Sequence, residues 1–251
     1  PIVDDIRAHG GSAVRRWVHK LDSPEIVDPE SVQLEVSAEE IAVARTEVER
    51  YDAGRRNGLG LLKAIETAIE NVVTYHEDQP RSIDWETEVR HGVTAGERVT
   101  PIDSVGIYVP RGKGSFPSVA YMLAVPAYIA GVPEIAICTP PDGGGVADAA
   151  CLVTAEMVAS RFGRLPSIYK IGGAQAIAAL AFGAEPIPRV AKVVGPGNEY
   201  VTAAKRIVAG HIDTGLPAGP SESLVICDET SDPLIAAHEL LVEAEHGPRS
   251  S

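Results

Sequence analysis

The sequence is short of cysteine, of clustered basic charge and of long apolar runs, and each shortage excludes a class of protein. Its three cysteines, Cys138, Cys151 and Cys227, have no CxxC or metal-ligand spacing, which excludes a disulfide framework and fits a reduced cytoplasm. The formal net charge is −13 with no run of Lys and Arg, so we expect no nucleic-acid partner. No apolar run reaches the roughly 18 residues of a membrane span, and we expect neither insertion nor secretion.

Three common site motifs are also missing. The stretch GIYVPRGKGS has five residues between Gly106 and Gly112, and Gly114 follows Lys113, so it is not a GxxxxGK[ST] phosphate loop. No GxGxxG follows the first predicted strand. Ser221 is not in a GxSxG elbow, and we expect no serine nucleophile.

The residues that are present favour helices packed on a parallel sheet. Apolar residues make up 45% of the 251 residues and aromatic residues only 5%. Four strand-turn-helix units follow one another: VGIYVP with PSVAYMLAVPAYIAG, EIAICTPP with VADAACLVTAEMVASRF, SIYKIGG with AQAIAALAFG, and AKVVGPG with NEYVTAAKRIVAG. Such a succession predicts parallel strands joined by right-handed crossovers, as in a Rossmann-like sheet.

The flanking segments predict a second, discontinuous domain. Residues 1–78 have the periodicity of three helices, with Ser37 as an N-cap, and residues 82–101 alternate as in an antiparallel hairpin. SLVICD at 223–228 predicts a further strand before a closing helix. We therefore expect an α/β fold with two Rossmann-like parallel-sheet domains: 1–105 plus 222–251, with N-terminal helices and incomplete, and 106–221. The sequence starts inside a helical pattern without methionine, and we expect both ends to be cut.

Glycine-rich turns at the ends of the predicted strands mark the expected ligand site. In open parallel sheets, ligands bind at the carboxyl ends of the strands, which groups YVPRGKGSF, IGGAQA, GPGNE and PAGPSE. Gln175 and Asn198 open the helices after two of these turns. They are either solvated helix starts or ligand contacts, and two carboxamides could bind a ribose or an adenine without a fixed charge.

The closing helix carries a polar face. Asp232 is the expected N-cap, and Glu239, Glu243 and His246 fall within about 60° of one another. Leu234, Leu241 and Ala244 point elsewhere, toward a core. A carboxylate and an imidazole three residues apart can share a zinc ion. Spacing alone leaves open whether this face holds metal or is solvated.

Taken together and in this order, VGIYVPRGKGSFPS, IGGAQAIAALAFGAE, KVVGPGNEYVTAAKR, LPAGPSES and EAEHGPRSS resemble the histidinol dehydrogenase family. The resemblance implies oxidation of L-histidinol to L-histidine through the aldehyde with two NAD, in histidine biosynthesis. It also implies a homodimer with one zinc ion per site. The 106–221 unit would then be the NAD-binding domain.

Matching motifs carry the family's functional residues onto this chain. Tyr108, Gln175 and Asn198 match NAD contacts, and Ser221 matches a substrate contact. His246 matches a ligand of both zinc and substrate, and so does position 243, where the family usually has glutamine and this chain has Glu243. The family's general acid/base pair and remaining zinc ligands lie beyond residue 251, so no catalytic residue is assigned here and we expect this stretch alone to be inactive.

Two departures from the family pattern leave alternatives open. Glu243 could tighten a divalent cation or could mark a relative that uses another alcohol. PRGKGS replaces the common PGG and adds the charge of Arg111 near the cofactor turn. The alternatives are a zinc-independent NAD-dependent alcohol dehydrogenase of the same family, or a non-catalytic nucleotide-binding remnant.

Overall fold

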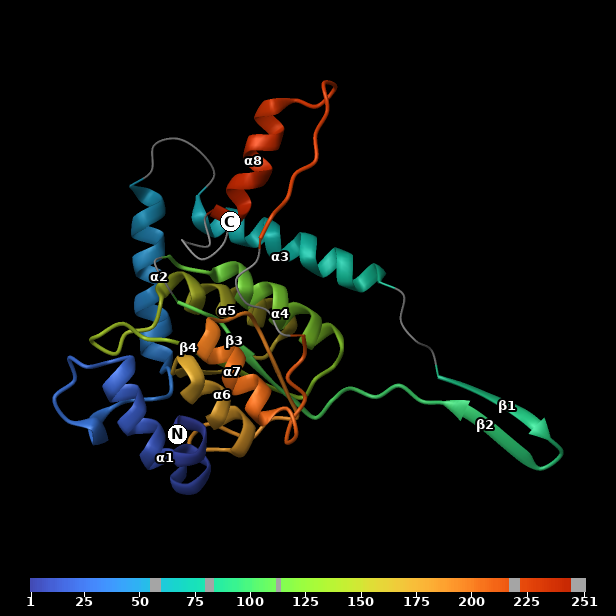
Figure 1. Ribbon diagram of the computed structural model, residues 1–251, viewed down its shortest axis with the longest axis horizontal. Helices are drawn as coiled ribbons and strands as arrows, with labels where there is room; N and C mark the ends of the chain where they lie inside the picture. Colours follow the sequence, from blue (N-terminus) through green and yellow to red (C-terminus); the bar gives the residue numbers. More distant parts are fainter. Residues whose placement is uncertain (55–59, 80–83, 112–113, 217–221, 245–251) are drawn as a thin grey trace.

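A four-stranded parallel sheet forms the centre of the computed structural model, which describes residues 1–54, 60–79, 84–111, 114–216 and 222–244 (Figure 1). The strands are β3 (Ser104–Tyr108), β4 (Glu134–Thr139), β5 (Ser167–Lys170) and β6 (Lys192–Val194), in the order β5-β4-β3-β6. Numbered along the chain, the strand order is 3-2-1-4, the arrangement of a Rossmann half-sheet. Successive strands are added on one side of β3 up to β5, and the chain then crosses to the other side of β3 to form β6. The predicted α/β fold with a parallel sheet is confirmed.

Each face of the sheet carries its own apolar cluster. Alternate strand residues point to opposite faces, so Ile107 and Ile137 join one cluster while Tyr108 and Cys138 join the other. Helices α4 (Pro117–Ile129) and α5 (Ala149–Phe162) cover the first face, and α6 (Gly173–Phe182) and α7 (Glu199–Val208) cover the second. Side chains cap two of these four helices: the Asp148 carboxylate accepts the Cys151 amide at 2.9 Å at the start of α5, and Asn198 caps α7.

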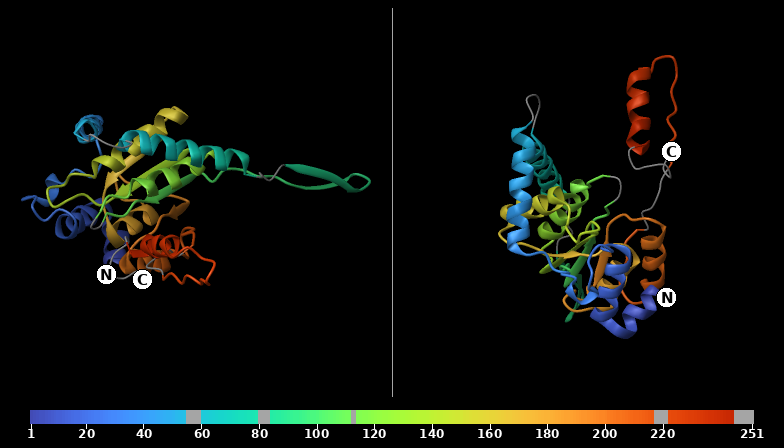
Figure 2. Two further views of the ribbon diagram at one scale, coloured as in Figure 1. Left: turned by 90° about the horizontal axis from the view of Figure 1, so that it is seen from above. Right: turned by 90° about the vertical axis from the view of Figure 1, so that its left-hand side faces the viewer.

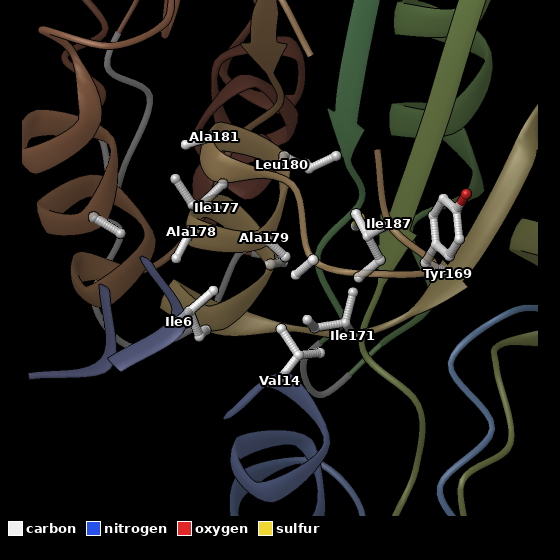
Figure 3. Packing of buried hydrophobic residues seen from close by; sticks show 14 of the residues in the cluster. Ile6, Val14, Tyr169, Ile171, Ile177, Ala178, Ala179, Leu180, Ala181 and Ile187 are labelled. Atoms are coloured by element: carbon white, nitrogen blue, oxygen red, sulfur yellow. The ribbon is translucent and has the colours of Figure 1, made fainter. Parts of the chain in front are cut away.

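The N-terminal helices pack on the outside of these layers. They are α1 (Ile2–Leu21), α2 (Ala38–Ala53) and α3 (Leu61–Asp78), and they contact α6, α5 and α4 respectively. A 3-10 turn, η1 (Pro29–Ser31), follows α1, and the predicted cap Ser37 forms a capping box with Glu40. Ile6 and Val14 of α1 point into the cluster around Ile177 and Ile171 (Figure 3). Helix α1 is thereby packed against α6.

Two segments extend away from the layered body. The predicted antiparallel hairpin, β1 (Trp85–Arg90) and β2 (Val93–Glu97), is exposed on both faces and projects sideways in Figure 1 and in the left view of Figure 2. Helix α8 (Pro233–Ala244) starts after Asp232, whose carboxylate accepts the Leu234 amide at 2.8 Å, as predicted. Leu234 and Leu241 of α8 are 65% and 60% exposed, so the expectation that they face a core is wrong for the described residues.

Residues 223–228 differ from prediction. They form no strand, because a strand needs a paired neighbour and none of the described strands lies beside them. The described residues contain a single parallel sheet, and the division at residues 105 and 222 stays a prediction. Within the same residues, none of the helices combines the length and the apolar character needed to cross a membrane.

Candidate functional site

The candidate site lies where the strand order reverses, at the carboxyl ends of β3 and β6. Gly195 follows β6 directly with a φ of +115°, a conformation that favours glycine. Its backbone lies against the main-chain carbonyl of Tyr108, so that a β-carbon at position 195 would overlap that oxygen. Glycine is therefore required for the turn after β6 to reach the end of β3.

Tyr108, the last residue of β3, connects this strand to the turn before α6. Its ring is buried, and the phenolic oxygen accepts a hydrogen bond from the Gly173 amide at 3.1 Å. Burial raises the pKa of Tyr108 well above its ordinary range, which keeps the phenol neutral. A predicted cofactor residue is thus fixed on a glycine of the IGGAQA turn.

Gln175 lies in the first turn of α6, as predicted, but it is not a solvated helix start. Only 2% of its surface is exposed, and its Nε2 donates to Oδ2 of Asp22 at 3.0 Å. The same Oδ2 accepts the Gly172 amide at 3.0 Å. Burial raises the pKa of Asp22, while these two hydrogen bonds oppose that shift. The structure therefore brings Tyr108 and Gln175 together around one glycine pair.

Asn198 caps α7. Its Oδ1 accepts the amides of Tyr200 and Val201, both at 3.1 Å, and the residue is exposed. This is the helix-start role that the sequence left open. Because the oxygen is occupied by the cap, the amide nitrogen is the group that Asn198 can offer to a ligand.

Lys205 is a residue that the sequence analysis missed. It lies on α7, is 5% exposed, and its Nζ donates to the carbonyl of Gly195 at 2.5 Å. Burial lowers its pKa, and it has no acidic partner among the described residues. The pattern of apolar and polar residues in α7 does not predict its burial, because a lysine in a helix is normally solvated. The lysine places a positive charge beneath the turn that follows β6.

Arg111, the departure from the family pattern, is directed toward a neighbouring loop. Its Nη1 donates to the Val146 carbonyl at 2.9 Å, and its Nη2 lies 4.0 Å from Oδ2 of Asp142. Both partners belong to the loop between β4 and α5. Part of its charge is therefore compensated within the protein.

Three further residues were predicted to contact substrate or zinc: Ser221, Glu243 and His246. Ser221 and His246 lie outside the described residues, and Glu243 is in the last turn of α8. No group of three or more His, Cys, Asp or Glu side chains that could hold a metal occurs among the described residues. The donor types at positions 243 and 246, carboxylate and imidazole, are ones that zinc accepts.

Two hollows lie elsewhere on the surface. One of about 270 Å³ is lined by residues that include Ser23, Val32 and Lys170, and one of about 670 Å³ runs along α4. Tyr108, Gln175 and Asn198 line neither hollow. The candidate site is therefore identified by strand topology and hydrogen bonding.

Comparisons with known proteins identify the family of the chain. One family model, described as histidinol dehydrogenase, matches residues 1–251. A "Histidinol dehydrogenase homolog" from Rhizobium meliloti is 45% identical over 251 residues, which are 100% of this chain and 51% of the relative. A "Histidinol dehydrogenase" from Synechocystis is 42% identical over 250 residues, which are 100% of this chain and 54% of the relative.

A solved structure gives the same result. The crystal structure of histidinol dehydrogenase from Elizabethkingia anophelis is 37% identical and superimposes with a TM-score of 0.83, covering 99% of this chain and 53% of that one. The chain spans about half the length of the curated relatives it matches. Its sequence resemblance and its fold lead to the same family.

Proposed function

Because the chain belongs to the histidinol dehydrogenase family, we propose that the full-length protein oxidises L-histidinol to L-histidine with NAD, in two steps through the aldehyde. It acts in histidine biosynthesis, in the cytoplasm, as a homodimer. One observation carries this proposal: hydrogen bonds hold two predicted NAD contacts together at the carboxyl edge of the sheet. Tyr108 accepts the Gly173 amide, and Asp22 accepts hydrogen bonds from Gly172 and from Gln175.

The described residues suit an NAD-binding role. Gly172, Gly173 and Gly195 allow close packing at the strand ends: a β-carbon at these positions would meet Pro140, Gln175 and the Tyr108 carbonyl, so the glycines hold the turns of the proposed cofactor edge together. Gln175 and Asn198 supply amides, which recognise ribose hydroxyls or a carboxamide without a fixed charge. The buried charge of Lys205 attracts an anionic dinucleotide to the same edge.

The proposed chemistry removes two hydrides from one carbon. The primary alcohol is oxidised to the aldehyde, water adds, and the hydrated aldehyde is oxidised to the carboxylate. Bound NAD supplies the hydride acceptor, and zinc at Glu243 and His246 would hold the substrate. In this scheme Tyr108, Gln175 and Asn198 bind and orient the cofactor, and Ser221 contacts the substrate.

Steady-state kinetics of the full-length protein test this proposal. We expect NADH to form when L-histidinol and NAD are supplied, with a kcat/KM for histidinol well above that for other primary alcohols. Full-length protein that binds NAD but leaves histidinol unoxidised would disprove the substrate assignment.

Glu243 supports a second candidate, a zinc-independent NAD-dependent alcohol dehydrogenase of the same family. The family usually has glutamine at this position, and several of the relatives that match over the whole chain are named homologs of histidinol dehydrogenase. Comparing kcat/KM for a panel of alcohols between the wild type and Glu243→Gln separates the two. Histidinol as the preferred substrate of the wild type favours the first candidate, and another alcohol favours the second.

A further inference from the structure

Asp22 has no role in the sequence resemblance, yet it contacts the predicted cofactor site directly. It is the C-terminal cap residue of α1, and its amide donates to Val18 at 2.8 Å. Its carboxylate reaches across to the turn before α6, 150 residues further along the chain, where Oδ2 accepts hydrogen bonds from Gly172 and Gln175.

These bonds fix the orientation of the Gln175 amide. A carboxylate oxygen accepts hydrogen bonds, so the amide must turn its nitrogen toward Asp22 and its oxygen away from it. The oxygen then lies over Gly173: a β-carbon at that position would be 2.7 Å from Oε1. None of the hydrogen bonds of Gln175 within the described ranges uses Oε1, so this oxygen can accept one from a ligand.

The position of Asp22 is unfavourable for α1 but favourable for α6. A negative charge at the C-terminus of a helix opposes the helix dipole, whereas a negative charge at an N-terminus is stabilised. The Asp22 carboxylate lies at the C-terminus of α1 and also at the N-terminus of α6, because its hydrogen-bond partners are the N-cap Gly172 and the first-turn residue Gln175 of α6. The electrostatic benefit of this carboxylate therefore lies at the α6 turn and not at the end of α1.

We propose that Asp22 is a positioning residue for the cofactor: its carboxylate holds Gln175 so that the amide oxygen accepts a hydrogen bond from a ribose hydroxyl or an amino group of NAD. This inference rests on the proposed function. Asp22 acts through Gln175 and touches no substrate itself.

The test is a double-mutant cycle on NAD affinity in the full-length protein. Asp22→Ala removes the acceptor, and we expect the Kd for NAD to rise about tenfold, the effect of one or two lost hydrogen bonds. Asp22→Asn keeps an oxygen that can accept both bonds, and its Kd should stay within about threefold of wild type. KM for NAD should rise in Asp22→Ala while KM for histidinol stays unchanged.

Coupling to Gln175 distinguishes positioning from general support of the fold. Because Asp22 acts through Gln175, the variant with both Asp22→Ala and Gln175→Ala should bind NAD no more weakly than Gln175→Ala alone. Additive losses, or wild-type affinity in Asp22→Ala, would overturn the proposal. Wild-type protein that binds no NAD would instead reject the proposed function itself.

A second pair of variants covers the case in which Asp22→Ala does not fold. Gln175→Glu places a carboxylate against Asp22, and the two like charges should push the side chain away and weaken NAD binding. Adding Asp22→Asn supplies a donor for the new carboxylate and should restore most of the affinity. Failure of this second change to restore binding would overturn the proposal.

Discussion

The backbone of Gly195 lies against the main-chain carbonyl of Tyr108, leaving no room for a side chain at position 195. The contact joins the turn after β6 to the last residue of β3, at the one place where the strand order of the sheet reverses. Both residues belong to the turns whose sequences predicted the cofactor site. The candidate site therefore depends on a glycine.

Substitution of Gly195 by alanine should destabilise the full-length protein by about 1–3 kcal/mol, because the new β-carbon overlaps a carbonyl and φ is +115°. Gly210→Ala is the matched control, since a β-carbon there meets nothing within 4 Å. Denaturant unfolding measures both variants. Equal stabilities of the two would show that the turn can move away from β3.

Replacing Tyr108 with phenylalanine should cost about 1–3 kcal/mol of unfolding free energy, because the Gly173 amide loses its partner in a buried turn. The control is Tyr75→Phe, at a residue that is 67% exposed. Calorimetric or denaturant unfolding can compare them. A Tyr108 variant as stable as the Tyr75 variant would argue that the Gly173 amide finds another acceptor.

The stability contributed by Asp22 should depend on pH. Burial raises its pKa above the ordinary 3.8, so between pH 3.8 and the folded-state pKa the folded protein holds a proton that the unfolded chain has released. Its contribution is then greatest below pH 3.8 and is lost as pH rises through the folded-state pKa. The stability of the wild type relative to Asp22→Asn should fall over that range.

Asp213, an exposed carboxylate, should show the opposite dependence of stability on pH. Hydrogen bonds from the Gly215 amide and from Lys192 lower the pKa of Asp213. The wild type should therefore gain stability relative to Asp213→Asn as pH rises toward 3.8. Slopes of the same sign for the two variants would contradict the burial of Asp22.

The sheet and its site-forming turns could be predicted because each depends on local sequence. Four strand-turn-helix units specify parallel crossovers, and the glycine-rich turns must then meet at one edge. Gln175 followed from its place after one of these turns, whereas Tyr108 was predicted only from the family resemblance. The N-terminal helices were recognised as helices, but an amphipathic face does not reveal its partner, so their packing on α4, α5 and α6 was not predicted.

Asp22 and Lys205 were missed for a related reason. Asp22 is 153 residues from Gln175 in sequence, and no spacing rule connects the end of one helix to the start of another. One signal was available: an acidic residue at a helix C-terminus opposes the helix dipole. Lys205 lies on the face of α7 that packs on the sheet, next to Ala204 and Val208 of the apolar cluster, and reaches Gly195 from there. A sequence pattern predicts only apolar residues on such a face.

If Glu243 is a zinc ligand, Glu243→Gln in the full-length protein should hold zinc more weakly, because glutamine keeps an oxygen donor but loses the negative charge. Zinc retained after dialysis against a chelator measures this. Glu239→Gln, four residues earlier on the same predicted helix face, is the control and should retain zinc like the wild type. Full-length wild type that contains no zinc would favour the zinc-independent alternative.

The most direct test of the account is the stoichiometry of the reaction catalysed by the full-length protein. NADH formed and L-histidinol consumed are measured together, with L-histidine identified as the product. The account predicts two NADH for each histidinol. One NADH per histidinol with accumulation of the aldehyde, or NAD binding without any NADH, would contradict it.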